Sequence, residues 1–321
     1  MSILVAGGGG FIGGHLVREL LSAGKDVKCV DVKPLDEWHQ VHDGARNIVA
    51  DLMHPEACDV VVQGTDEVYN LAADMGGMGF IENNKAACML SVLINTHLLM
   101  AARDHSVGKY FYASSACVYA GEKQESPEVT ALAEADAYPA DPEDGYGWEK
   151  LFGERMGRHF MEDYGIEFRT ARYHNVYGPL GTWDGGREKA PAAVSRKIAH
   201  AKHTGNYEIE VWGDGLQTRS FMYIDDCVVG TRKLMASEMT DPINIGSSEL
   251  ITINGLVDLV AELAGIEVTR THKLDAPQGV RGRNSDNTLI QATLDWQPSI
   301  SLRDGMQKTY EWIEAEYLKT V

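Results

Sequence analysis

The sequence predicts an α/β fold in which a doubly wound parallel sheet is joined to a smaller C-terminal part. Short apolar runs of strand type alternate with helical periods through roughly the first half of the chain. A cluster of glycines stands between the first such run and the first helical period. Strands that alternate with helices need crossover connections, which place parallel strands in a sheet covered on both faces.

The strand and helix patterns divide the chain into two parts. The clearest strands are Ile3 to Ala6, Asp26 to Val32, Glu67 to Ala72 and Lys109 to Ser114. Helical periods cover Phe80 to Arg103, Gly147 to Tyr164, Ala190 to His203 and Ile224 to Ala236. Beyond about Asn175 the sequence becomes rich in turn-forming residues. We expect residues 1–174, with a returning segment near 221–246, to form a Rossmann-type domain, and residues 175–220 and 247–321 to form the smaller part.

Composition limits the possible partners and compartments. A formal charge of -18 argues against binding to nucleic acid or to anionic membranes. The five cysteines are widely separated and include no C-x-x-C spacing, so neither a metal site nor a disulfide framework is expected. That cysteine usage fits a reduced cytoplasm, and no signal-like N-terminus or long uninterrupted apolar run is present. We therefore expect a cytoplasmic protein without a membrane span.

The glycine cluster has the features of a dinucleotide-binding loop. Gly7, Gly10 and Gly13 follow the first strand in G-x-x-G-x-x-G spacing and lead into a helix. Glycines allow a tight turn and close approach to a pyrophosphate, whose charge the helix N-terminus favours. Asp31 ends the second strand, where a carboxylate can accept both ribose hydroxyls of NAD and repel the phosphate of NADP; Asp51 can accept from the adenine amino group. The alternative is a structural turn with two solvated aspartates.

A second group of residues is suited to redox chemistry at a sugar hydroxyl. Tyr146 and Lys150 stand one helical turn apart, and Ser115 ends a predicted strand. A phenol is a weak base unless a nearby ammonium favours its ionised form. A Tyr and Lys at this spacing on a solvated helix face are the alternative. With the glycine loop and "YASSACVY", these residues resemble the extended short-chain dehydrogenases, which include nucleotide-sugar epimerases and dehydratases.

The residues after Ser115 limit which type of reaction the chain is expected to catalyse. In the sugar 4,6-dehydratases of that family an Asp-Glu pair stands where this chain has Ala116 and Cys117. A thiol beside cationic groups can act as an acid or a base. Lys189, in "GGREKAPAA", is the candidate opposite partner, because desolvation can prepare an amine for proton exchange. The alternatives are a buried small residue for Cys117 and a solvated lysine for Lys189.

Longer segments resemble the GDP-mannose 3,5-epimerase family: "ADMGGMGFI", "YASSACVY", "GGREKAPAA", "WGDGLQTRSF" and "GVRGRNSDN". The resemblance implies that bound NAD serves oxidation and re-reduction at C4 with Ser115, Tyr146 and Lys150. Cys117 and Lys189 would exchange protons at C3 and C5, giving GDP-L-galactose and GDP-L-gulose. Other 4-keto chemistry on a GDP-sugar (single-centre or C4 epimerisation, dehydration), net dehydrogenation and a non-catalytic NAD-binding regulator remain alternatives.

The resemblance also implies two sets of binding residues and a homodimer. The cofactor set is Gly7, Gly10, Phe11, Ile12, Gly13, Asp31, Asp51, Leu52, Ala72, Tyr146 and Lys150. The GDP-sugar set is Gly76, Ser115, Ala116, Asn175, Glu188, Lys189, Ala190, Lys197, Gln217, Thr218, Arg219 and Arg283. The helical stretches 80–103 and 147–164 are those through which family members pair. Gly145, and the "VYAGEKQESPE" loop, depart from the family pattern, which leaves the sugar specificity and product ratio open.

Overall fold

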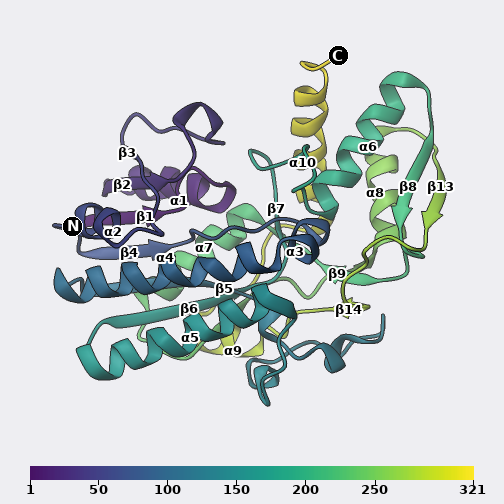
Figure 1. The fold of residues 1–321 in the computed structure, drawn as a ribbon. Coiled ribbons are helices and arrows are strands. Elements are labelled where there is room, and N and C mark those ends of the chain that lie inside the picture. Colours follow the sequence, from purple (N-terminus) through teal and green to yellow (C-terminus); the bar gives the residue numbers. More distant parts are fainter.

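The computed structural model describes residues 1–321 and shows a doubly wound α/β arrangement (Figure 1). Seven strands form the main sheet in the order β11-β6-β5-β4-β1-β2-β3, and all neighbours pair in parallel. The first strand, β1 (Ser2–Ala6), lies between β2 (Asp26–Asp31) and β4 (Glu67–Asn70). Because the chain winds in opposite directions on the two sides of β1, the loops after β1 and β4 meet at a switch point. The predicted fold class is confirmed.

Helices cover both faces of this sheet. The other strands are β3 (Arg46–Val49), β5 (Lys109–Ser115), β6 (Glu167–Tyr173) and β11 (Ile243–Ile245). One face packs against α2 (Pro55–Val62), α4 (Lys85–Asp104) and α5 (Asp144–Tyr164), and the other against α1 (Phe11–Ser22) and α7 (Ile224–Ala236). A short helix, α3 (Met78–Asn83), precedes α4.

The side chains of β1 show how the two halves of the core are divided. Ile3 and Val5 belong to the larger apolar cluster, which includes residues of α1 and α7, whereas Leu4 and Ala6 belong to the cluster that includes α2 and α4. Successive strand residues point to opposite faces, so a strand covered on both faces is apolar throughout. This burial keeps the ends of β1, β4 and β5 in place, where the candidate site lies.

The C-terminal part is built from three helices, α6 (Ala190–Thr204), α8 (Ile253–Ala264) and α10 (Leu302–Tyr317), which pack on one another. The remaining elements are short: β7 (Val176–Tyr177), β8 (Glu208–Trp212), β9 (Thr218–Ser220), β10 (Met222–Tyr223), β12 (Leu250–Thr252), β13 (Thr269–Lys273), β14 (Gly282–Arg283) and α9 (Thr288–Leu294). Strand β9 pairs with β14 so that Arg219 lies opposite Arg283. Two arginines far apart in the sequence therefore lie on neighbouring strands.

The boundaries of several elements differ from the prediction. The predicted helix 80–103 is divided at Asn84, whose φ of -132° and ψ of 39° interrupt the helix between α3 and α4. Strand β4 ends at Asn70 rather than Ala72, because the Asn70 side chain accepts a hydrogen bond from the Ala72 amide and turns the chain. The segment containing β11 joins the main sheet. The division into parts at 174, 220 and 246 stays a prediction.

By length and composition, α4 is the one helix that meets the criterion for a membrane span. Core helices of globular proteins meet the same criterion, and α4 packs against α2 and α5 beside the main sheet. Its composition therefore carries little weight for a membrane location.

Candidate active site

The glycine loop fits a pyrophosphate closely. Gly7 has a φ of +78°, and a Cβ there would lie 2.9 Å from the Ala72 nitrogen. A Cβ at Gly13 would lie 2.1 Å from the Gly7 carbonyl oxygen, so only glycine permits this approach of α1 to the loop. Gly10 caps α1 without a side-chain hydrogen bond, which leaves the first amides of the helix available to an anion.

The predicted adenosine-binding residues lie at the ends of the adjacent strands. Asp31 ends β2; it is buried, and one carboxylate oxygen accepts from the Lys33 amide at 3.2 Å. Asp51 follows β3 and accepts from the Met53 amide at 2.9 Å, while Leu52 is buried behind it. In α1, Phe11 packs against His15, and Ile12 contacts the larger apolar cluster. These carboxylates, the glycine loop and the free helix end suit NAD.

The residues predicted for redox chemistry meet where β5 ends and α5 begins. The Ser115 hydroxyl oxygen accepts from the Cys117 amide at 3.2 Å, and Ser115 lies near enough to Tyr146 to influence the pKa of its hydroxyl. The Lys150 ammonium lies 5.5 Å from the ring centroid of Tyr146 and 5.0 Å from that of Tyr112. Burial raises the pKa of the Tyr146 hydroxyl well above its usual value, while the nearby Ser115 side chain lowers it. Tyr146 therefore needs added positive charge nearby in order to act as a base.

Glu149 is part of this cluster, although the sequence did not single it out. Its carboxylate lies 3.3 Å from the Lys150 ammonium, and both side chains are buried. The Tyr112 hydroxyl donates to the other carboxylate oxygen at 3.0 Å. In the sequence, a glutamate directly before a lysine in a helix looks like a solvated residue. Only the packing of α5 on β5 reveals that Glu149 is buried in contact with Lys150 and Tyr112.

Cys117 lies among cations from three separate segments. Arg283 donates to its sulfur at 3.5 Å, and both Lys189 and Arg219 interact with it electrostatically. Burial lowers the pKa of the Lys189 ammonium, whereas its attraction to Cys117 raises it. The other four cysteines are fully buried, while Cys117 is partly exposed. The thiol and Lys189 can therefore exchange protons with a ligand placed near them.

Two loops fix Lys189 near the site. The Gly77 amide donates to the Arg187 carbonyl at 3.0 Å, and a Cβ at Gly77 would lie 2.6 Å from the Glu188 carbonyl oxygen. The Glu188 carboxylate accepts from the Gly186 amide at 2.7 Å and from Arg196 at 2.9 Å. The glycines at 76 and 77 thus bring their loop against the loop that contains Glu188 and Lys189, and Ala190 opens α6 directly after it.

A cavity of about 620 Å³ opens beside these residues. Cys117 and Tyr146 line it, together with Gln124, Glu143 and Arg281. This volume lies within the range of small-molecule sites. The residue predicted for redox chemistry and the residue predicted for acid/base chemistry therefore face the same cavity.

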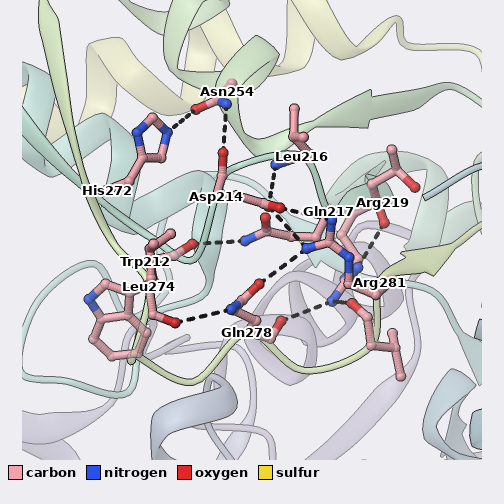
Figure 2. A network of polar contacts seen from close by, with 12 residues as sticks. Trp212, Asp214, Leu216, Gln217, Arg219, Asn254, His272, Leu274, Gln278 and Arg281 are labelled. Carbon is pink, nitrogen blue, oxygen red and sulfur yellow. Dashed lines mark hydrogen bonds and ion pairs between the residues drawn. The ribbon is translucent and has the colours of Figure 1, made fainter. Parts of the chain in front are cut away.

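A polar network lies at one end of this cavity (Figure 2). Arg281 forms two hydrogen bonds of 3.0 Å with the Asp214 carboxylate, and Arg219 donates to the carbonyls of Gln278 and Val280. Burial lowers the pKa of Arg219 to about 10. The sequence missed Arg281 and Asp214, although both stand in segments that carried the family resemblance; their pairing becomes visible only in the fold.

Gln217 leaves a place for a ligand donor. Its amide nitrogen donates to the Trp212 carbonyl at 3.0 Å, whereas its buried amide oxygen has no hydrogen-bond partner. Buried acceptors are nearly always satisfied in folded proteins, so such an atom marks a position where a ligand hydrogen bond would be favourable. This observation agrees with the predicted place of Gln217 in the GDP-sugar set.

Other predicted substrate residues are engaged within the protein. The Asn175 amide donates to the Ser220 carbonyl at 3.0 Å, and the Thr218 hydroxyl donates to the Pro127 carbonyl at 2.6 Å. Lys197 donates to the Glu210 carbonyl at 2.7 Å and lines a separate cavity of about 250 Å³. Gly76 and Ala116 lie close to the main site, since they adjoin the Gly77 loop and Cys117. Their contacts with a substrate stay predictions.

The fold and this site define an NAD-dependent enzyme. Residues 3–246 match the family model described as the NAD dependent epimerase/dehydratase family. The chain is 45% identical to GDP-mannose 3,5-epimerase 1 of Oryza sativa subsp. japonica, over 99% of this chain and 83% of the relative. It is 44% identical to GDP-mannose 3,5-epimerase of Arabidopsis thaliana, over 99% of this chain and 84% of the relative.

A solved structure shares the fold. The crystal structure of UDP-glucose 4-epimerase with UDP-glucose from Thermotoga maritima aligns with a TM-score of 0.88 and 25% identity, over 98% of this chain and 99% of that chain. The chain therefore belongs to the NAD dependent epimerase/dehydratase family. It is an isomerase, and its cofactor is NAD.

Proposed function

We propose that this chain is a GDP-mannose 3,5-epimerase that produces GDP-L-galactose and GDP-L-gulose. The relatives of that name at 44% and 45% identity span almost the whole chain. The single observation that carries the proposal is the presence of Cys117 and Tyr146 on one cavity, with Lys189 held near the thiol. That arrangement provides both redox and acid/base groups for one sugar ring.

The redox half of the reaction occurs at C4. NAD, which the glycine loop and Asp31 would hold, would supply hydride chemistry at this carbon. Tyr146 takes the proton of the C4 hydroxyl, while Ser115 holds the same oxygen through a hydrogen bond. Lys150 lies beside the Tyr146 ring, where its positive charge favours the phenolate. The proton returns from Tyr146 to the oxygen when C4 is reduced again.

The epimerisation half occurs at C3 and C5. Once C4 is a ketone, the hydrogens on both neighbouring carbons are acidified. Cys117 and Lys189 come from different segments, and one can remove a proton while the other delivers one to the opposite face. The low pKa that burial imposes on Lys189 makes proton release less costly. Ala116 and Cys117 replace the Asp-Glu pair that dehydration requires, which disfavours that alternative.

We also propose a homodimer formed through α4 and α5, which lie side by side (Figure 1). Both helices carry large apolar side chains that keep 46% to 54% of their surface exposed: Met89, Leu90, Trp148 and Phe152. Apolar surface of this kind is commonly covered by a partner. The free cysteines favour the cytoplasm as the compartment. Sedimentation of the purified protein tests the dimer, which a monomer at micromolar concentration would contradict.

Product analysis tests the activity. Purified enzyme is incubated with GDP-mannose, the GDP-hexoses are identified by NMR, and NADH absorbance is recorded during the reaction. The expected result is two new GDP-hexoses without accumulation of NADH. Tyr146→Phe is the matched control, because it keeps the buried ring but removes the hydroxyl that takes the proton. Unchanged GDP-mannose with wild-type enzyme would contradict the substrate, and stoichiometric NADH would indicate a net dehydrogenase.

A further inference from the structure

Glu143 connects the acid/base residue to the helix that carries the redox residues. It stands directly before α5 and lines the cavity with Cys117 and Tyr146. Its backbone amide donates to the Cys117 carbonyl at 2.9 Å. Its carboxylate forms an ion pair with Arg283, whose guanidinium donates to the Cys117 sulfur at 3.5 Å. One arginine thus joins a carboxylate and a thiol.

Arg283 is held in a single orientation. Its Nε donates to the Gln124 side-chain oxygen at 2.7 Å, one terminal nitrogen pairs with Glu143, and the other contacts Cys117. Gln124 is fully buried and donates in turn to the carbonyls of Tyr119 and Ala120. The planar guanidinium therefore has a partner on each nitrogen, and its positive charge is shared between the thiol and the carboxylate.

The proposed role of Cys117 in epimerisation requires that both its thiol and its thiolate form be accessible. The thiol must lose a proton and later receive one, so neither of its two forms should be strongly favoured. Three cations face it, Arg283, Lys189 and Arg219, and cations beside a cysteine in general stabilise a thiolate over a thiol. Tyr146 also faces it but is neutral at rest. Other carboxylates line the cavity, and Glu143 is the one that pairs with Arg283, the cation in contact with the sulfur.

We propose that Glu143 is a positioning residue that orients Arg283 against Cys117 and offsets part of its charge, so that Cys117 can act as both acid and base. This role of Glu143 rests on the proposed function, because proton exchange at C3 and C5 is the reason why Cys117 needs both forms. It also gives Arg283 a role beside Cys117 in addition to its predicted place in the GDP-sugar set.

Selective alkylation of Cys117 tests the proposal. The NAD-bound enzyme, without any sugar nucleotide, is treated with iodoacetamide at neutral pH, and mass spectrometry follows modification of each cysteine. The other four cysteines are fully buried, so the fast reaction reports Cys117. Glu143→Gln keeps an oxygen that can accept from Arg283 but removes the negative charge. If the carboxylate and thiolate charges are taken as about 6 Å apart in water, loss of the carboxylate charge favours the thiolate by about threefold. A more stable thiolate is also a weaker nucleophile, so we expect alkylation to accelerate by about twofold or more.

The controls separate this role from a structural one. Glu125→Gln removes a charge from the same cavity lining at an exposed position without a contact to Arg283, and it should change the rate less. Arg283→Met removes the cation and should slow alkylation. Glu143→Gln should also lower kcat for epimerisation without raising KM. Unchanged or slower alkylation in folded Glu143→Gln would overturn the proposal. Because no sugar nucleotide is present, this result is independent of whether GDP-mannose is the substrate.

Discussion

Gly13→Ala tests the close approach on which cofactor binding depends. The added Cβ would lie 2.1 Å from the Gly7 carbonyl oxygen and 2.8 Å from the Gly8 Cα, and both are backbone atoms of the phosphate loop. The loop must therefore move. Overpacking of this kind costs about 1 to 3 kcal/mol, of which the better helix propensity of alanine recovers about 1. Loss of one charge-assisted hydrogen bond to the pyrophosphate would weaken NAD binding by about tenfold or more.

Gly14→Ala is the matched control, because it adds the same methyl group to the next residue of α1. Its Cβ would meet the side chain of Gln40, with the flexible amide nitrogen at 2.8 Å, so that group can move aside. The NAD released by denaturation and the thermal midpoint are measured for both variants. We expect Gly13→Ala to lose NAD and Gly14→Ala to retain it. Full NAD content and a wild-type midpoint in Gly13→Ala would refute the argument from close approach.

Three further predictions concern the thiol, the nucleotide end and the buried histidine. Cys117→Ala should abolish proton exchange at C3 and C5 while NAD stays bound, as deuterium incorporation and NAD content will show; unchanged exchange would reject its role. Arg219→Ala should raise the Kd for GDP-mannose by the equivalent of about 1.5 to 3 kcal/mol, measured by calorimetry, and undiminished binding would remove Arg219 from the site. Burial lowers the pKa of His174 to about 4, below its value of about 6.5 in an unfolded chain. The unfolded state thus binds more protons between these values, and stability present above about pH 6.5 is lost as the pH falls towards 4, by about 2 kcal/mol at pH 5. Urea unfolding at two pH values checks this, and a His174→Gln variant with the same loss would contradict it.

The main sheet could be predicted because hydrophobic periodicity and the alternation of strands and helices along the chain can be read locally from the sequence. The glycine loop, Asp31 and the Tyr146 and Lys150 pair also stand at positions that the order of elements defines. The division of the predicted helix 80–103 at Asn84 was missed, because no glycine or proline marks the break. A single side chain that competes for backbone hydrogen bonds is a weaker signal than helical periodicity.

The electrostatics of the site could not be predicted from sequence in the same way. Gln124, Glu143 and Arg283 are far apart in the chain, and only the placement of β14 beside the loop after β5 brings them to one thiol. The family resemblance placed Arg283 in the GDP-sugar set, and that place stays a prediction. The contacts of its three nitrogens with Gln124, Glu143 and Cys117 depend on the tertiary fold, so no local pattern indicates them.

Deuterium incorporation at each sugar carbon is the measurement that tests the central claim most directly. Enzyme and GDP-mannose are incubated in D2O, and NMR follows the label at C3, C4 and C5 in substrate and products. The account predicts deuterium at C3 and C5 and none at C4, because the C4 hydrogen leaves and returns as hydride. Deuterium at C4, or new GDP-hexoses without label at C3 and C5, would contradict keto-mediated epimerisation at this site.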